Sequence, residues 1–181
     1  GGWRGRALMG SELRGKTLGL VGCGNVGRLI AHKLSAWELA GCIGYDPYLT
    51  HEQLAASGIR KVELAELWDT ADIISLHLPL TPETKHSVGA EEFARMKQGA
   101  LLINAARGGV VDEAALEEAL KSGKLCGAIL DVFEDEPKVP TGLLSLPNVL
   151  LTPHIAGYTH EADKEVSLNP VREFLRRIAV Q

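Results

Sequence analysis

The sequence predicts an α/β fold: a doubly wound, mostly parallel sheet with helices on both faces. Short apolar runs alternate with segments of helical apolar spacing along most of the chain, which is the order that parallel sheets require. Several runs, such as Ala100–Asn104, are apolar at almost every position, as is typical of strands covered on both faces. The 181 residues suffice for one domain with a real core.

Composition excludes several classes of protein. A net charge of −4 argues against nucleic acid as the main partner, since that partner needs a basic face. The sequence has no apolar run of membrane-spanning length, so we expect no membrane partner. Cys23, Cys42 and Cys126 are scattered thiols without C-x-x-C spacing. They favour a cytoplasmic protein with no disulfide framework and no metal site.

We expect three segments along the chain. Residues 1–16 are basic and glycine-rich and predict a connecting arm, whose Trp3 and Met9 are candidate contacts to a partner subunit. Residues 17–160 form the main domain, and residues 161–181 form a helical segment that Pro170 should kink or interrupt. The chain begins with glycine and not with Met, so we expect it to be part of a longer polypeptide.

The first predicted strand, Thr17–Val21, leads into a glycine turn and then a helical pattern over Val26–Trp37. The phosphates of a dinucleotide need this order of strand, turn and helix. Gly22 allows the tight turn, Gly24 lets the backbone approach a pyrophosphate, and Gly27 lets helix and strand pack closely. The helix N-terminus adds free N–H groups and a positive dipole end. A plain strand-to-helix turn is the alternative.

A second strand, Cys42–Tyr45, ends in Asp46. This acid lies about 20 residues after Gly27, where the acid of a Rossmann fold meets the adenosine ribose. A turn-forming Asp-Pro fits equally well, and both interpretations can hold. Because no Arg or Lys follows in Pro47-Tyr48, a 2′-phosphate would lack its usual partner. The pattern therefore favours NAD over NADP.

The remaining elements follow in order. Thr50 and Gln53 have capping-box spacing, and Leu64 and Trp68 lie at helical spacing, more typical of core than of cofactor contacts. Asp112 is a candidate cap for a helix with an apolar stripe. The later strands are predicted over Ile59–Val62, Ile73–Leu78, Ala100–Asn104, Gly127–Leu130 and Val149–Leu151.

Ionisable residues follow most of the predicted strands, at the edge where open parallel sheets bind ligands. Arg107 is suited to clamp a carboxylate. His154 is suited to acid/base work on a hydroxyl or carbonyl, with Glu136 holding the imidazolium. The alternatives are a surface arginine, a structural histidine and a solvated acidic turn; His86 reads as a loop residue. The strand-end residues are Asp46, His77, Arg107, Asp131, Glu136 and His154.

Four motifs in order, G-C-G-N-V-G, N-A-A-R-G-G, D-V-F-E-D-E-P and T-P-H-I-A-G, carry a resemblance. From about Trp3 to Ala162 the chain resembles the NAD-binding domain of the D-2-hydroxyacid dehydrogenase family, which includes phosphoglycerate dehydrogenase and the glyoxylate/hydroxypyruvate reductases. The resemblance implies NAD as cofactor and hydride transfer between NAD(H) and a small 2-hydroxy/2-oxo acid. It also implies a homodimer that forms through this domain.

The resemblance assigns roles to residues. Arg107 would bind the substrate's carboxylate and carbonyl, His154 would be the proton donor, and Glu136 its partner. Backbone N–H groups of Asn25 and Val26 would meet the pyrophosphate. Asp46 would hold the ribose, Asp131 would meet the nicotinamide side, and Gly157 would lie beside the ring. The full cofactor set is Gly22, Gly24, Asn25, Val26, Gly27, Asp46, Leu78, Ala105, Ala106, Arg107, Asp131, His154 and Gly157.

The chain also departs from the family pattern. The flavodoxin-like substrate lobe is absent, so the chain alone should bind NAD(H) yet turn over 2-oxo acids poorly. Tyr158-Thr159 resembles the erythronate-4-phosphate dehydrogenase branch, whereas N-A-A-R-G-G-V-V-D-E is closer to phosphoglycerate dehydrogenase. A carboxylate at Glu136 argues against formate as substrate.

Two readings from other classes stay open. An NAD-sensing corepressor module shares this fold, but those proteins have a Trp shortly after the His, where this chain has Ile155-Ala156-Gly157-Tyr158. Methyl transfer from S-adenosylmethionine also uses such a glycine turn, but it leaves Arg107, Glu136 and His154 unexplained.

Overall fold

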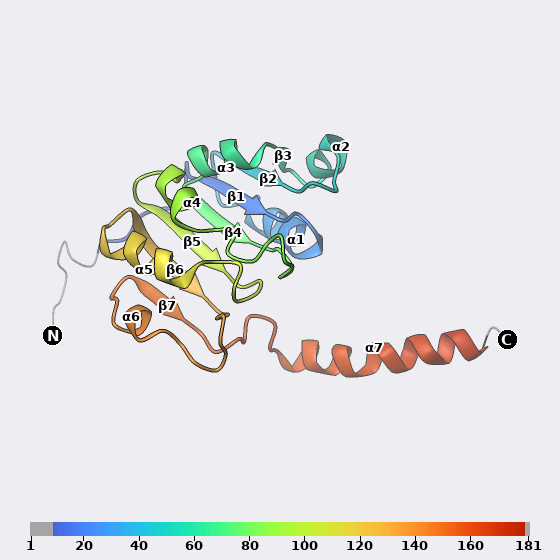
Figure 1. Ribbon diagram of the computed structural model, residues 1–181. Coiled ribbons are helices and arrows are strands. Elements are labelled where there is room, and N and C mark those ends of the chain that lie inside the picture. Colours follow the sequence, from blue (N-terminus) through green and yellow to red (C-terminus); the bar gives the residue numbers. More distant parts are fainter. Residues whose placement is uncertain (1–8, 180–181) are drawn as a thin grey trace.

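The computed structural model describes residues 9–179 and contains a seven-stranded parallel sheet (Figure 1). The strand order is β3-β2-β1-β4-β5-β6-β7, so the chain starts in the middle, winds to one edge and returns to build the other half. This confirms the predicted doubly wound fold, with its switch point between β1 and β4. The strands are β1 Thr17–Val21, β2 Gly41–Tyr45, β3 Arg60–Lys61, β4 Ile73–Leu76, β5 Ala100–Asn104, β6 Leu125–Leu130 and β7 Val149–Leu151.

Helices connect the strands, and two of their predicted caps are present. Thr50 and Gln53 form a reciprocal capping box, and the Asp112 carboxylate accepts hydrogen bonds from two backbone N–H groups of the next turn. The helices are α1 Asn25–Leu34, α2 His51–Ala55, α3 Leu64–Thr70, α4 Ala90–Arg95, α5 Glu113–Lys121, α6 Thr141–Leu144 and α7 His160–Ala179.

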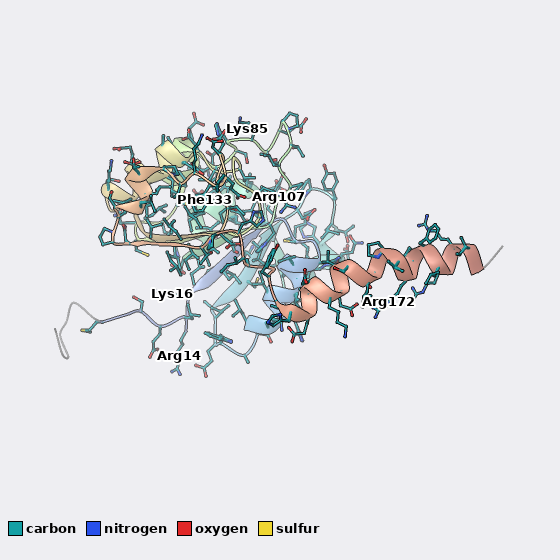
Figure 2. All side chains as sticks on the ribbon, turned by 90° about the horizontal axis from the view of Figure 1, so that it is seen from below. Arg14, Lys16, Lys85, Arg107, Phe133 and Arg172 are labelled. Carbon is teal, nitrogen blue, oxygen red and sulfur yellow. The ribbon has the colours of Figure 1, made fainter. Side chains whose placement is uncertain are left out.

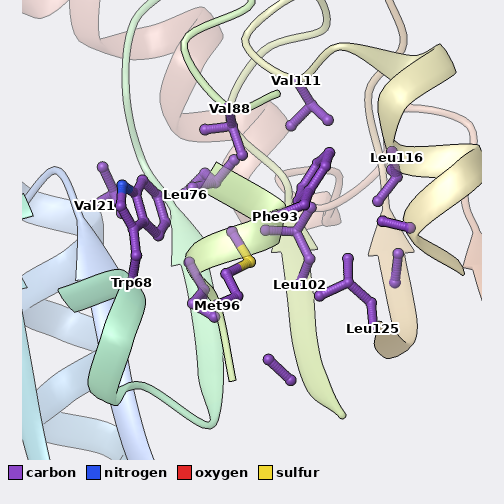
Figure 3. Packing of buried hydrophobic residues seen from close by; sticks show 14 of the residues in the cluster. Val21, Trp68, Leu76, Val88, Phe93, Met96, Leu102, Val111, Leu116 and Leu125 are labelled. Atoms are coloured by element: carbon purple, nitrogen blue, oxygen red, sulfur yellow. The ribbon is translucent and has the colours of Figure 1, made fainter. Parts of the chain in front are cut away.

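The core lies on both faces of the sheet. Helices α3, α4 and α5 cover one face, where Trp68, Phe93 and Leu116 pack against strand residues such as Leu102 (Figure 3). Helices α1 and α2 cover the other face around β1, where Leu54 belongs to a smaller buried cluster. Strand β1, which lies between the two clusters, is therefore covered on both sides, as its apolar sequence predicts.

The α1 and α2 side of the sheet is covered unevenly. In register, Leu20 of β1 is followed across the sheet by Ser75, Ile103, Ile129 and Leu150. Leu20 is fully buried, Ile103 and Ile129 are half-buried, and Leu150 is 57% exposed. Within residues 9–179, two-sided covering therefore holds near β1 and weakens toward β7.

Several predicted elements differ from the structure. Helix α1 ends at Leu34, and Trp37 lies in the turn beyond it, where Glu38 adopts a φ of 55°. Strand β4 ends at Leu76, two residues before the predicted end, as the chain approaches Pro79. The short helix α6 was not predicted, because four residues carry too little periodicity to reveal a helix.

The C-terminal segment is a single helix, α7, that projects away from the sheet (Figure 1). Of the kink or interruption predicted at Pro170, the interruption is wrong, since the helix is continuous through that residue, and the kink stays a prediction. Most of its described side chains are exposed, so water is available to a carbonyl that proline leaves without a donor. The predicted arm contact Trp3 lies outside the described residues, and residues 9–16 form no helix or strand.

We predict that Leu102→Ala lowers the free energy of unfolding by about 2–5 kcal/mol, because it opens a cavity at a fully buried position of β5. Leu150→Ala on β7 is the matched control, since its side chain is mostly exposed and its loss should cost less than about 1 kcal/mol. Urea denaturation followed by circular dichroism measures both. Equal losses would contradict the assignment of the core.

Candidate active site

The glycine turn after β1 depends on two close backbone approaches. A Cβ on Gly22, whose φ is 88°, would lie 2.6 Å from the carbonyl oxygen of His77. A Cβ on Gly27 would lie 2.6 Å from the carbonyl oxygen of Gly22. Both distances are too short for any side chain, so these glycines are required by packing. Gly24 differs, because a Cβ there would meet no atom within 4 Å. The space beside Gly24 therefore suits an approaching ligand.

The N-terminus of α1 faces that open space. Its N-cap is Gly24, which has no side chain to accept from the free N–H groups, and the first turn carries no acid. Such an uncapped helix end presents backbone donors and a positive dipole to an anion. The turn therefore fits the pyrophosphate of a dinucleotide, as its sequence predicts.

Asp46 is buried beside the turn, with 9% of its surface exposed. One carboxylate oxygen accepts a hydrogen bond of 2.9 Å from the backbone N–H of Cys23, and the other accepts one of 2.9 Å from Tyr48. The second bond is the turn that Asp-Pro predicted. Asp46 thus ties the end of β2 to the glycine turn, and its contact with a ribose stays a prediction.

Two clefts lie along the carboxyl ends of the strands. The larger, of about 600 Å³, is lined by Gly22, Gly24, Asp46 and apolar side chains that include Trp68 and Leu78. Trp68 therefore belongs to the hydrophobic core and also lines the larger cleft. The smaller, of about 280 Å³, is lined by Val26, His77, Leu78, Pro79, Ala105, Ala106 and Arg107. The structure thus brings the predicted cofactor residues of β1, β4 and β5 to one edge.

Two ionisable side chains near the turn are structural. Burial raises the pKa of the Cys23 thiol to about 12, so it is an inert filler and not a nucleophile. Burial lowers the pKa of His77, whose Nε2 lies 3.0 Å from the hydroxyl of Ser75. A neutral His77 therefore forms part of the cleft wall.

His154 and Glu136 meet at the ends of β7 and β6. The Nδ1 atom of His154 lies 2.9 Å from a carboxylate oxygen of Glu136, and the other oxygen accepts a hydrogen bond of 3.0 Å from Phe133 N–H. The hydrogen bond with His154, aided by that of Phe133, lowers the pKa of Glu136. Glu136 is therefore ionised at neutral pH and orients the imidazole, as the sequence predicts.

Asp131 holds the segment that carries His154. Its buried carboxylate accepts hydrogen bonds from the Thr152 hydroxyl at 2.6 Å and from the N–H groups of Ile155 and Ala156 at 2.8 Å each. His154 between them adopts a φ of 55°, which is uncommon for a residue with a side chain. The role predicted for Asp131 beside the nicotinamide stays a prediction, as does that of Gly157.

Arg107 is exposed on the loop that follows β5. The Asn104 side chain supports this loop, because it donates to the Arg107 carbonyl and accepts from the Ala106 N–H, at 3.1 Å each. A Cβ on Gly108 would lie 1.8 Å from the carbonyl oxygen of Phe133. The arginine loop therefore packs against the turn that leads to Glu136; Figure 2 labels Arg107 and Phe133 among the side chains.

Glu134 contacts three other segments of the chain, and its sequence pattern did not predict this role. Its carboxylate lies 3.0 Å from Lys85 Nζ and 2.8 Å from His86 Nε2, and its N–H donates to Glu113 at 2.8 Å. The acidic turn is therefore not simply solvated, and His86 is more than a loop residue. The partners are far apart in sequence, so no local pattern indicated the contact.

The comparisons with known proteins agree with this geometry. Residues 1–156 match the family model described as D-isomer specific 2-hydroxyacid dehydrogenase, NAD binding domain. The chain belongs to this family. Its cofactor is NAD, as the lack of Arg or Lys after Asp46 predicts.

Among curated relatives, D-3-phosphoglycerate dehydrogenase from Methanocaldococcus jannaschii is 47% identical over 165 residues, which cover 91% of this chain and 31% of that protein. Hydroxypyruvate reductase from Thermotoga maritima is 43% identical over 183 residues, covering 99% of this chain and 58% of that protein. A glyoxylate reductase from Paecilomyes thermophila has a similar solved structure, with a TM-score of 0.85 and 40% identity; the match covers 92% of this chain and 50% of that one. The chain therefore spans only part of these relatives.

We predict that acid releases the His154 segment. Burial by itself would raise the pKa of Asp131, but the hydrogen bonds from Thr152, Ile155 and Ala156 outweigh it and lower the pKa. Stabilisation by the carboxylate is therefore complete above the ordinary aspartate pKa of about 3.9 and is lost as the pH falls through the lowered value. Amide NMR shifts of Ile155 and Ala156 should stay constant from pH 7 to about pH 4 and move below it.

A matched pair of variants tests the same contact at neutral pH. Asp131→Asn removes one of the two acceptor oxygens, so amide hydrogen exchange at Ile155 and Ala156 should quicken by about tenfold or more. Asp163→Asn, on the exposed first turn of α7, should leave these rates unchanged. Unaltered exchange in Asp131→Asn would refute the role of this carboxylate.

Proposed function

We propose that this chain is the cofactor-binding part of a cytoplasmic oxidoreductase that transfers hydride between NAD(H) and C2 of a D-2-hydroxy/2-oxo acid. The substrate is of the phosphoglycerate, glyoxylate or hydroxypyruvate type, as the names of the relatives suggest. The observation that carries the proposal is the pair of His154 and Glu136 at the strand ends, with Arg107 on the neighbouring strand end. Three free cysteines support the cytoplasmic setting.

His154 serves as the acid and base of the reaction. Its Nδ1 is engaged by Glu136, so Nε2 is left to exchange a proton with the substrate oxygen. In the reducing direction the imidazolium gives its proton to the carbonyl oxygen, which becomes the hydroxyl. Glu136 stabilises the imidazolium before that transfer and fixes the ring orientation. NADH, when bound, supplies the hydride that reduces C2.

Arg107 holds the substrate. Its guanidinium donates one hydrogen bond of 2.6 Å to the carbonyl of Ala106, and the side chain is exposed at the edge of the sheet where the strands end. A guanidinium has five N–H donors in a planar fork, which matches a carboxylate through two of them. Its permanent charge also draws electrons toward the carbonyl oxygen of a 2-oxo acid. Arg107 therefore positions the substrate and polarises the carbonyl whose oxygen His154 protonates.

The remaining predicted residues would hold the cofactor. The uncapped N-terminus of α1 would take the pyrophosphate at Asn25 and Val26, and Asp46 would take the ribose. Leu78, Ala105 and Ala106 line the smaller cleft beside Arg107, where the nicotinamide half would lie. The larger cleft is mainly apolar around Trp68, which suits an adenine ring.

We predict that Arg107→Gln and His154→Gln each lower kcat/KM for 2-oxo acid reduction by about 100-fold or more in the complete, active protein. Both variants should still bind NADH within about threefold, because the turn that anchors it is untouched. Stopped-flow or steady-state absorbance at 340 nm and calorimetric titration give the two values.

Asp135→Asn is the control for that pair. Asp135 lies in the same turn as Glu136, but it is exposed and pairs only with Lys138 within the described residues. Its loss should leave turnover unchanged. Full activity in both the Arg107 and His154 variants would sink the role assignment.

We further propose that the protein forms a homodimer through this domain. Exposed large apolar side chains support this, notably Leu29 on α1, Trp37 in the turn after it and Met9 in the arm. Isolated exposed apolar residues are common, but Leu29 and Trp37 belong to one short stretch of chain, helix α1 and the turn that follows it.

Sedimentation equilibrium tests the dimer. Leu29→Glu and Trp37→Glu each place a charge on the proposed interface and should shift the protein toward monomer. Leu144→Glu on α6 is a control, because Leu144 is at least as exposed but lies on a different part of the fold. A monomer for the unaltered protein at tens of micromolar would count against the proposal.

A further inference from the structure

Arg28 reaches back over the glycine turn. It is the fourth residue of α1, and helical side chains lean toward the helix N-terminus. Its Nη2 donates to the Asn25 side-chain oxygen at 3.1 Å, and its Nε lies 3.4 Å from the carbonyl oxygen of Gly24. The guanidinium is therefore held at the rim of the turn and is not extended into solvent.

This placement is electrostatically unfavourable without an anion. A cation at a helix N-terminus opposes the helix dipole, and the first turn of α1 contains no acid. Arg28 makes no ion pair within residues 9–179. Its charge does reach the turn, because it partly counters the rise in pKa that burial causes in Cys23. The carboxylate of Asp46 also contacts the turn, through the N–H of Cys23, but it forms no ion pair with Arg28 within the described residues.

The guanidinium also keeps unused donors. Two of its five N–H groups make the contacts with Gly24 and Asn25, which leaves three. The space beside Gly24 is also open, because a Cβ added there would meet no atom within 4 Å. An anionic ligand at the uncapped helix end would therefore find backbone N–H groups and a fixed cation together.

We propose that Arg28 is a phosphate-binding residue whose guanidinium donates to the pyrophosphate of the bound dinucleotide, beside the N–H groups of α1. This inference rests on the proposed binding of NAD at the glycine turn. Asn25, the first residue of α1, has a neutral side chain. It carries no charge of its own and orients Arg28 through their hydrogen bond. Arg28 thereby supplies a cation beside the neutral donors of the turn.

The test compares ligands that do and do not contain the pyrophosphate, using the 181-residue chain. Arg28→Gln should raise the Kd of NADH and of ADP-ribose by about tenfold, the loss expected for one charge-assisted hydrogen bond. The Kd of adenosine, measured by NMR titration, should not change. Arg28→Lys should restore part of the affinity, and the loss in Arg28→Gln should shrink at high salt.

Lys33→Gln is the matched control, because Lys33 is an exposed cation at the other end of the same helix. It should leave every Kd within about twofold. An equal loss for adenosine would show that Arg28 only shapes the turn, and a loss confined to NADPH would place it at a 2′-phosphate; either overturns the inference. Unchanged NADH affinity in Arg28→Gln also overturns it, while NAD binding itself stands. Failure of the unaltered chain to bind NADH would refute the proposed function.

Discussion

The buried carboxylate of Asp131 is the interaction on which the reactive side of this structure depends. A buried carboxylate is costly unless its oxygens are hydrogen-bonded, and three donors from the chain after β7 supply those bonds. The same bonds hold His154 in a backbone conformation that it would otherwise adopt rarely. Because β6 and β7 are adjacent, the end of one strand thus fixes the histidine that follows the other.

The loops at the strand ends form a continuous set of contacts. Gly108 brings the Arg107 loop against Phe133, and the Phe133 N–H binds Glu136, which in turn contacts His154. Glu134 extends the set to the loop that carries Lys85 and His86. The same loop continues from Pro79 and lines the larger cleft. The cofactor cleft and the proton-transferring pair therefore share one framework.

Much of the fold was predictable because it follows from local chemistry. Apolar runs located the strands, and Asp112 marked a helix start, since their signals lie within a few residues. The pairing of His154 with Glu136 was predictable only because the parallel sheet gathers strand ends at one edge. The contacts of Glu134 were not predictable, because 48 residues separate it from His86. The interruption predicted at Pro170 does not occur, and water can reach the carbonyl that proline leaves without a donor on this exposed helix.

The sequence alone determined the order of strands and helices, the glycines of the nucleotide turn and the types of residue at the strand ends. These depend on backbone conformation and periodicity, which act over short distances. Only the tertiary structure decided which charges meet: Asp131 with the His154 segment, Glu134 with Lys85 and His86, and Arg28 with the rim of the turn. Such pairings depend on loop paths between strands, and a loop path depends on packing across the sheet as well as on the residues of the loop.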